Sequence, residues 1–441
     1  MPIFSADRTP VRQAIGGGLG IMHGPFAVTE ASGGTAPLVN SIALPFRNND
    51  QVLGMSLYVA SGGGSGQERV VTTATVIGVP SGMGLRIDRA WTTVPSTNGT
   101  FELWERVTPG RVNSFINDAI RGASRRVLEH KVDYSVQLLD LLRHWGSFER
   151  WPDGTTSAPD GWTLTGSGGT VTRNAVVKYA GRYSAAVAAA LNTATFLESD
   201  DIPEWPKFAG NIVTVRAKVY TTTSGRVRVQ ILDGVNTFSS GYHDGIGGWD
   251  GNAGAPIIIN GVTLSNALTQ LRVRLTTDSG AALTVYWGKV WVDTGDKVYE
   301  FELPQSGTTE TAFTYLSEVW LESASLDGVF NVRLPTSYYD VDRDSSPRRL
   351  VFKRGAIDDF MTAGRGVMLV GQRSARVPTA DTDNLEVDPE YVRRQVSVLV
   401  LDSLPLDEMG RSRRDRFARE AAEYLEHLAT PVYPDAIPVE R

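Results

Sequence analysis

Short stretches in which polar and apolar residues alternate dominate the middle of the chain, between residues 146 and 296. Alternation with a period of two places apolar side chains on one face of a β-strand and polar side chains on the other. Turn residues separate these stretches, and no strong helical pattern interrupts them. Several evenly spaced strands of this kind pack as two sheets, so residues 146–296 are expected to form a β-sandwich of the jelly-roll type. The stretches are GTVTRNAVVKYAGRYSAAVAA, NIVTVRAKVYTTT, GRVRVQILD, NALTQLRVRLTT and ALTVYWGKVWVDTG.

Residues 1–145 also contain short β-branched and aromatic runs, separated by segments rich in Gly, Ser, Pro and Asn. This pattern predicts a small antiparallel sheet or barrel after an irregular N-terminal arm. A helix is expected next, because Thr108 can cap its first turn, Pro109 suits its first position, and apolar residues then recur at spacings of three and four. The glycine-rich stretches IGGGLG and SGGGSG lack the other features of a phosphate-binding loop and are expected to be ordinary loops.

Residues 297–441 are expected to add further strands and then two helices. Asp388 can cap the first of these helices, and Pro389 suits its first turn. The second helix, roughly residues 407–428, is charged and carries a narrow apolar stripe. The predicted architecture is therefore an α+β body, mainly β with a few helices. Residues 1–145 and 297–441 build this body, and the sandwich is inserted between them.

The composition of the chain narrows the classes of function. A length of 441 residues indicates two or three domains, and a net charge of −6 is too small to indicate a nucleic-acid-binding protein by itself. The chain contains no cysteine, which excludes disulfides, thiolate metal sites and cysteine nucleophiles. The sequence shows neither an apolar segment of the signal-peptide type nor a run of about eighteen apolar residues, so we expect neither secretion nor a membrane span.

The sequence offers no arrangement of residues that is typical of an enzyme. A glycosidase needs two carboxylates about 5 to 10 Å apart, whereas the acidic residues of 146–296 lie mostly in polar loops. A serine hydrolase would need a G-x-S-x-G turn, which does not occur. The five histidines are scattered and form no zinc motif. We therefore expect a protein without catalytic residues and without a cofactor.

One glycine-rich loop within residues 146–296 carries the residue types that bind sugars. Aromatic faces stack on pyranose rings while neighbouring polar groups bind the hydroxyls. The loop SGYHDGIGGWDGNAG combines both kinds of side chain, and a further tryptophan lies in another loop. A subunit contact and a surface loop without a binding role are the alternative interpretations. The candidate glycan contacts are Trp205, Tyr242, His243, Trp249 and Asn252.

The stretch YYDVDRDSS places Asp340, Asp342 and Asp344 at alternate positions, as at the start of a calcium-binding loop. An EF-hand would need glycine at position six and glutamate at position twelve, where this chain has Ser345 and Val351. The three aspartates are thus weak candidates for another kind of metal site, and a polar loop between strands is the preferred interpretation.

Basic residues outnumber acidic ones between residues 343 and 376, where eight basic residues accompany three acidic ones. Such a positive band could face an acidic neighbour or packaged DNA. A solvated loop and strand edge would explain the same composition. The candidate basic band consists of Arg343, Arg348, Arg349, Lys353, Arg354, Arg365, Arg373 and Arg376.

The stretches GSFE, PDGW and AGRYSAAV make residues 146–296 resemble carbohydrate-binding modules of the galactose-binding-like and family-four-like sandwiches. The resemblance implies a sandwich fold in which Phe148 and Trp162 belong to the core. It also implies that a displayed sandwich binds bacterial surface glycans.

The flanking body resembles virion structural proteins of tailed bacteriophages, in particular those near the head–tail junction. VNSFINDAIRGASRRV, FTYLSEVWLES, RRLVFKRG and GRGVMLVGQRSARVPTADTDNLEVDPEYV carry this resemblance. It implies a ring-forming neck or adaptor protein of the virion that is made in the bacterial cytoplasm. Its partners would be portal, neck or tail rings and copies of itself, with packaged DNA as an indirect partner and no membrane. The alternatives are a tail or capsid-decorating virion protein and a carbohydrate-binding or glycan-active protein.

Overall fold

The computed structural model divides the chain into two compact units. Unit 1 comprises Met1–Glu129 and Ser374–Pro431, and unit 2 comprises His130–Arg373 and Val432–Arg441. The boundaries expected near residues 145 and 296 both fall inside unit 2. The fold class is as predicted, mainly β with a few helices. The structure describes residues 7–32, 38–41, 44, 46, 49–77, 82–152, 155–166, 168–250, 257–304, 313–381, 383–432 and 436–439.

Unit 1 contains a seven-stranded antiparallel sheet with the strand order β1-β7-β4-β5-β6-β3-β2. Leu57, Leu85 and Phe101 belong to a buried cluster that this sheet encloses. The predicted small antiparallel sheet is therefore present. Its strands are β1 (Met22–Ala27), β2 (Glu30–Ser32), β3 (Leu38–Ser41), β4 (Ser56–Ser61), β5 (Glu68–Ile77), β6 (Gly82–Ile87) and β7 (Thr100–Trp104), with a 3-10 turn at Asn49–Gln51.

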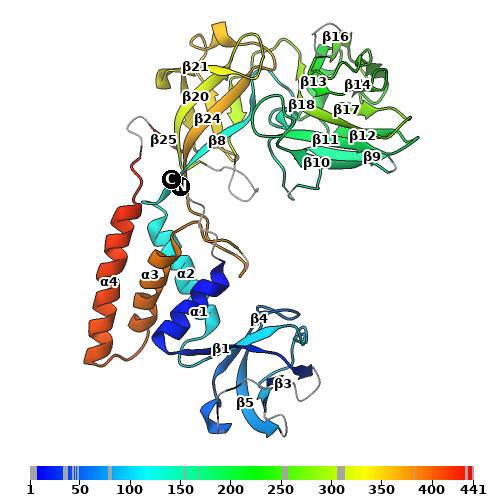
Figure 1. Ribbon diagram of the computed structural model, residues 1–441. Coiled ribbons are helices and arrows are strands. Elements are labelled where there is room, and N and C mark those ends of the chain that lie inside the picture. The colour runs from blue at the N-terminus through cyan, green and yellow to red at the C-terminus, as the bar shows by residue number, and fades with distance from the viewer. Residues whose placement is uncertain are drawn as a thin grey trace. The chain divides into compact units, whose positions relative to one another are not determined.

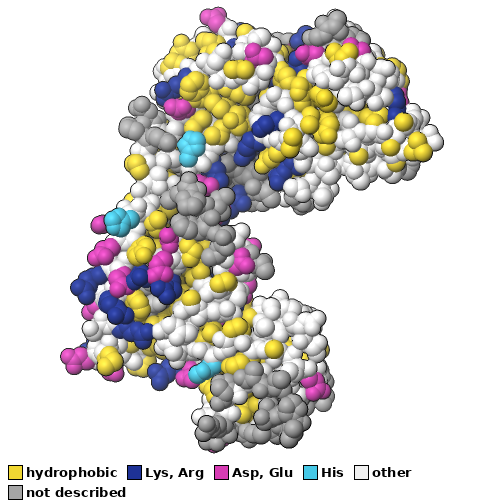
Figure 2. Space-filling model, in the orientation of Figure 1, with side chains coloured by type: hydrophobic (Ala, Val, Ile, Leu, Met, Phe, Trp, Pro, Cys, Tyr) yellow, Lys and Arg dark blue, Asp and Glu magenta, His cyan; other side chains and the backbone are white. Residues whose placement is uncertain are grey.

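Unit 1 also contains the helices α1 (Arg8–Leu19), α2 (Pro109–Ala123), α3 (Pro389–Asp402) and α4 (Glu408–Leu428), which Figure 1 shows in blue, cyan, orange and red. Two of the three helices predicted from the sequence begin at the predicted caps, Thr108 and Asp388, and the third begins after Asp407, where it was expected. The side chains of Thr108, Asp388 and Asp407 accept hydrogen bonds from backbone N–H groups in the first turns. Side chains of both charge signs cover the outer face of α4 in Figure 2, and Ala421 is its one buried residue among those described.

Helix α1 corrects the prediction that IGGGLG is a loop, because Gly16, Gly17 and Gly18 are helical. A side chain at Gly16 would lie 2.5 Å from Cβ of Met22 and 2.6 Å from the ring of Trp104. This close approach requires glycine, and the packing offsets a helix-propensity cost of about 1 kcal/mol per glycine. The helix ends at Gly20, whose φ of 72° is left-handed.

Unit 2 contains the predicted β-sandwich, which consists of two five-stranded antiparallel sheets. The first sheet has the order β10 (Thr170–Asn174), β11 (Ser184–Ala189), β18 (Leu283–Asp293), β13 (Ile212–Tyr220) and β16 (Ile257–Thr263). The second has the order β15 (Thr237–Ser239), β14 (Val227–Leu232), β17 (Arg272–Thr277), β12 (Thr195–Ser199) and β9 (Trp162–Gly166).

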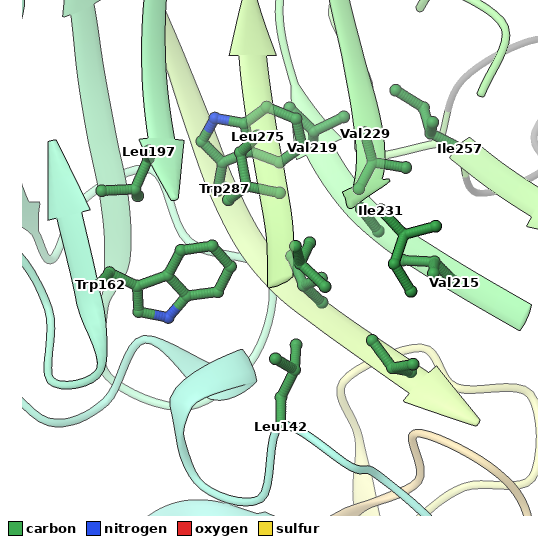
Figure 3. Packing of buried hydrophobic residues seen from close by; sticks show 14 of the residues in the cluster. Leu142, Trp162, Leu197, Val215, Val219, Val229, Ile231, Ile257, Leu275 and Trp287 are labelled. Carbon is green, nitrogen blue, oxygen red and sulfur yellow. The ribbon is translucent and has the colours of Figure 1, made fainter. Parts of the chain in front are cut away.

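The core of the sandwich lies between these two sheets. Figure 3 shows Trp162, Leu197 and Trp287 directed toward the space between them, together with valines from β13 and β14. Phe148 and Trp162 are buried, with ring centroids 5.3 Å apart. The two aromatic residues of the GSFE and PDGW stretches are therefore core residues, as predicted.

The rest of unit 2 consists of two smaller antiparallel sheets. β8 (Leu128–Gln137), β24 (Gly366–Ser374), β20 (Tyr315–Glu322), β21 (Phe330–Leu334) and β25 (Ile437–Pro438) form one of them. β19 (Glu300–Glu302), β23 (Arg349–Phe352) and β22 (Tyr339–Asp342) form the other. Both contribute to one buried apolar cluster. Short 3-10 turns occupy η2 (Trp145–Ser147), η3 (Trp205–Phe208), η5 (Thr336–Tyr338) and η6 (Asp358–Phe360). Within the described residues, no helix is long and apolar enough to cross a membrane.

Glu149 explains why the GSFE and AGRY stretches occur together. Its carboxylate is 1% exposed, and Oε1 accepts hydrogen bonds from the backbone N–H groups of Arg182 at 2.8 Å and Tyr183 at 3.0 Å. Gly181 makes room for this carboxylate, since a Cβ there would lie 2.3 Å from Oε1. Glu149 thus joins the GSFE stretch, at the entry of the sandwich, to the AGRY stretch just before β11. The role of Glu149 is therefore structural.

Burial raises the pKa of Glu149 to about 8. The folded chain therefore keeps this proton up to about pH 8, while the unfolded chain releases it near the ordinary value. We expect the stability of unit 2 to fall as the pH rises between these two values, with a slope of at most about 1.4 kcal/mol per pH unit for one group. Glutamine resembles the protonated acid, so Glu149→Gln should flatten the slope. Urea unfolding between about pH 5 and pH 8 tests this, and identical slopes for both proteins would contradict it.

Candidate functional site

The outer face of the sheet containing β13 and β18 carries aromatic side chains. Along β13, the buried residues Val215, Ala217 and Val219 belong to the core, and the intervening positions face outward. Tyr220 of β13 pairs in register with Tyr286 of β18, and their ring centroids lie 6.0 Å apart. Both tyrosines are partly exposed. The alternation of these strands therefore places two aromatic rings together on the outer face.

Two further rings complete this group. The ring of Trp249 lies 5.8 Å from that of Tyr220 and 5.8 Å from that of Tyr179. We call Tyr179, Tyr220, Trp249 and Tyr286 the aromatic cluster. Each of its four residues is partly exposed. Gly288 of β18 makes the arrangement possible, since a Cβ there would lie 2.6 Å from the Trp249 ring and 2.5 Å from Cβ of Tyr179.

Backbone hydrogen bonds hold the loop that carries Trp249 against β13. The N–H of Val219 donates to the carbonyl of Trp249 at 3.1 Å, and the N–H of Gly247 donates to the carbonyl of Thr221 at 3.0 Å. The next residue, Asp250, forms an ion pair with Lys218. The ammonium of Lys218 also lies 5.1 Å from the centroid of the Tyr179 ring. The aromatic cluster is thus held in place and has a charged pair at its border.

The predicted glycan contacts are not all in one place. Trp249 belongs to the aromatic cluster, whereas Tyr242 bonds to Asp278 and lies 4.8 Å below the guanidinium of Arg228. His243 is 0% exposed, and its Nδ1 accepts the N–H of Gly245 at 2.9 Å, so its ring is not open to a ligand. Trp205 lies in η3 and packs against the sandwich core. Asn252 lies outside the described residues.

Tyr179, Tyr220 and Tyr286 were not among the predicted contacts. The sequence could have indicated Tyr220 and Tyr286. In a strand with alternating polar and apolar residues, an aromatic residue at one of the polar positions points away from the core. Tyr179 has no such signal. It lies between β10 and β11, and only the folded chain brings it to Gly288 and Trp249.

The aspartates Asp340, Asp342 and Asp344 do not form a metal site in the described structure. Asp340 and Asp342 are exposed on β22, and Oδ1 of Asp342 accepts the N–H groups of Asp344 at 3.0 Å and Ser345 at 3.3 Å. These bonds are typical of a turn. Across the described ranges, no group of three or more His, Asp or Glu residues is arranged to hold a metal ion.

The predicted basic band is not one continuous surface. Arg365 is 4% exposed and donates to the carbonyls of Glu322 and Phe360, and Arg373 is 6% exposed. Arg376 belongs to unit 1, while the other members belong to unit 2. Arg343 and Lys353 are exposed, and Arg348 is partly exposed. Arg349 and Arg354 line a cleft of unit 2.

No family model matches the chain, and no curated protein does either. Parts of the chain are similar to solved structures. A carbohydrate-binding module, TmCBM61, solved with β-1,4-galactotriose, is 12% identical over 31% of this chain and 89% of its own, with a TM-score of 0.22. The xylan-binding CBM22-1 domain of Paenibacillus barcinonensis Xyn10C is 16% identical over 38% of this chain and 99% of its own, with a TM-score of 0.24.

A phage protein is also among the similar structures. The enzymatically active domain of tailspike protein 4 of bacteriophage CBA120 is 12% identical over 35% of this chain and 21% of its own, with a TM-score of 0.25. At these identities and TM-scores, the three likenesses do not establish a function for this chain.

Proposed function

We propose that the protein binds a glycan through the aromatic cluster on the outer face of the sandwich. The observation that carries this proposal is the grouping of four partly exposed rings on one sheet face, with the Lys218–Asp250 pair at their border. Pyranose rings present apolar faces that stack on such side chains, while lysine and aspartate hydrogen-bond to hydroxyls. This function corresponds to the glycan-binding alternative of the sequence analysis. The binding is proposed to occur without hydrolysis.

The resemblance of the flanking regions to tailed-phage structural proteins extends this proposal to a place in the virion. A glycan-binding virion protein would contact the surface polysaccharide of its bacterial host, and repeated copies would add avidity. We propose further that the protein forms a ring at the neck of the virion, and only the resemblance to head–tail junction proteins supports this position. Immunogold labelling of intact particles with an antibody against residues 146–296 tests it. Gold at the head–tail junction would support the neck, gold along the tail would move the protein there, and unlabelled particles would contradict a virion role.

Substitution of Trp249 by alanine is expected to weaken glycan binding by about tenfold or more, because the central ring of the cluster is lost. The measurement is affinity electrophoresis of the full chain in gels that contain purified bacterial surface polysaccharides. Tyr242→Phe is the control, since Tyr242 is also an aromatic residue that reaches the surface but lies outside the cluster. Equal retardation of Trp249→Ala and wild type would contradict the proposed site. Release of reducing ends from a bound polysaccharide would contradict binding without hydrolysis.

A further inference from the structure

A cleft of about 720 Å³ lies in unit 2, apart from the aromatic cluster. This volume is in the range of cavities that hold small organic ligands. The end of β8 and the segment after it, the turn around η3, and the strand β19 with its preceding segment line the cleft, together with two arginines from β23 and the turn after it. Its lining includes five cationic and four acidic side chains. These are Arg143, Lys207, Lys297, Arg349, Arg354, Asp140, Glu204, Glu300 and Glu302.

One wall of the cleft presents a fixed aromatic ring. The hydroxyl of Tyr299 donates to Asp358 at 2.7 Å, and Nζ of Lys297 lies 3.3 Å from the same carboxylate. The guanidinium of Arg354 lies 5.3 Å from the centroid of the Tyr299 ring. Tyr299 is thus held at its hydroxyl and stacked beside a cation. Phe208 of η3 adds a second ring to the lining.

The cations of the cleft differ in their partners. Arg143 pairs with Glu302 at 2.7 Å, Lys207 with Glu204 at 2.5 Å, and Arg349 with Glu300 at 2.9 Å. Within the described part of the chain, the exposed side chain of Arg354 takes part in no ion pair. Arg354 is therefore the cation of the cleft that is open to an external anion. Its planar guanidinium suits a carboxylate, which it can bind through two parallel hydrogen bonds.

We propose that this cleft binds the carboxylate-bearing residue of an acidic saccharide, with Arg354 as the contact to the carboxylate. The inference rests on the proposed glycan-binding function and names the class of glycan. Phe208 and Tyr299 would contact the apolar face of the sugar ring, and Glu204, Glu300 and Glu302 would accept hydrogen bonds from its hydroxyls.

The test is isothermal titration calorimetry of the full chain with trigalacturonic acid, and with its methyl ester as the matched neutral ligand. We expect the acid to bind about tenfold or more tightly than the ester, and its affinity to fall as salt is added. Arg354→Gln should weaken binding of the acid by about the same factor and leave binding of the ester unchanged. Arg343→Gln is the control, because Arg343 is an exposed arginine outside the cleft. An unchanged thermal unfolding curve would show that Arg354→Gln folds normally.

Four outcomes would overturn the inference: no binding of the acid, equal binding of acid and ester, insensitivity to Arg354→Gln, or tighter binding of a single-stranded oligonucleotide at the cleft. The Trp249→Ala variant separates this inference from the proposed function. If Trp249→Ala no longer binds the acid while Arg354→Gln still binds it, the acid binds at the aromatic cluster and not in the cleft. If Arg354→Gln no longer binds the acid while Trp249→Ala binds every polysaccharide like wild type, the proposed site at the aromatic cluster is contradicted and the proposed site in the cleft is supported.

Discussion

Replacing Glu322 with glutamine is expected to lower the free energy of unfolding of unit 2 by about 3 to 5 kcal/mol, because it leaves the ammonium of Lys289 buried without a counter-charge. Oε2 of Glu322 lies 2.5 Å from Nζ of Lys289, and the residues are 0% and 4% exposed. Glu322 also accepts the N–H groups of Gly328 and Gly366, each at 2.7 Å. One carboxylate thus connects the sandwich strand β18 with β20, β24 and the turn before β21.

Urea unfolding of the full chain measures the loss, and hydrogen exchange at β18 and β20 assigns it to unit 2. The double variant Lys289→Met/Glu322→Gln should recover most of the lost stability, since neither member of this buried pair is then charged. Glu318→Gln, on the same strand but partly exposed, is the matched control and should cost less than about 1 kcal/mol. A loss for Glu322→Gln as small as that of Glu318→Gln would show that the lysine is neutral or solvated in the folded chain.

The parts of the fold that follow from local patterns were predictable. Alternation with a period of two identified the strands of the sandwich, because burial on one face imposes that period. Thr108 and Asp388 marked the helix starts, since a side-chain acceptor satisfies a free N–H of the first turn. The division into units was not predictable in this way. It depends on contacts between residues far apart in sequence, such as that between Lys289 and Glu322, and no local pattern records them.

Helix α1 shows how packing can overrule local preference. Three consecutive glycines disfavour a helix, so the sequence predicts a loop there. The helix forms in the structure because Gly16 approaches Met22 and Trp104 more closely than any other residue type could. The local sequence therefore disfavours a helix in this segment, whereas the tertiary contact of Gly16 favours one.

The candidate site was predictable only in part, because the local sequence does not show which side chains the fold buries. Trp249 was found because tryptophan in a glycine-rich loop is uncommon in a core. His243 has similar neighbours in sequence but is fully buried, since the N–H of Gly245 donates to its ring and its own backbone N–H bonds to Val227. The residues of the predicted basic band likewise do not share one surface, because Arg365 and Arg373 are buried while Arg343 and Lys353 are exposed. Proximity in sequence does not decide which side chains share a surface.

Replacing Arg12 with methionine is expected to lower the free energy of unfolding of unit 1 by about 3 to 5 kcal/mol. Arg12 is 0% exposed, and its guanidinium lies 3.2 Å from Glu102 of β7 and 2.7 Å from Asp381. It also donates to Asn113 of α2 at 3.1 Å and lies 4.4 Å from the centroid of the Tyr58 ring. Removing the guanidinium leaves the carboxylate of Glu102, itself 0% exposed, without its cation. Methionine keeps much of the volume, so the loss reports on charge more than on packing.

Urea unfolding measures this loss, with hydrogen exchange at α1 and β7 to assign it to unit 1. Arg121→Met is the matched control, because Arg121 pairs with Asp118 on the exposed side of α2, and we expect it to change the stability by less than about 1 kcal/mol. Arg12→Lys should be nearly as destabilising as Arg12→Met, since one ammonium cannot reach both carboxylates and Asn113 together. If both Arg12 variants behave like Arg121→Met, apolar packing among α1, α2 and α3 is enough to hold the two segments of unit 1 together. If they are strongly destabilised, the buried charges around Arg12 are required to hold residues 7–129 and 374–431 together.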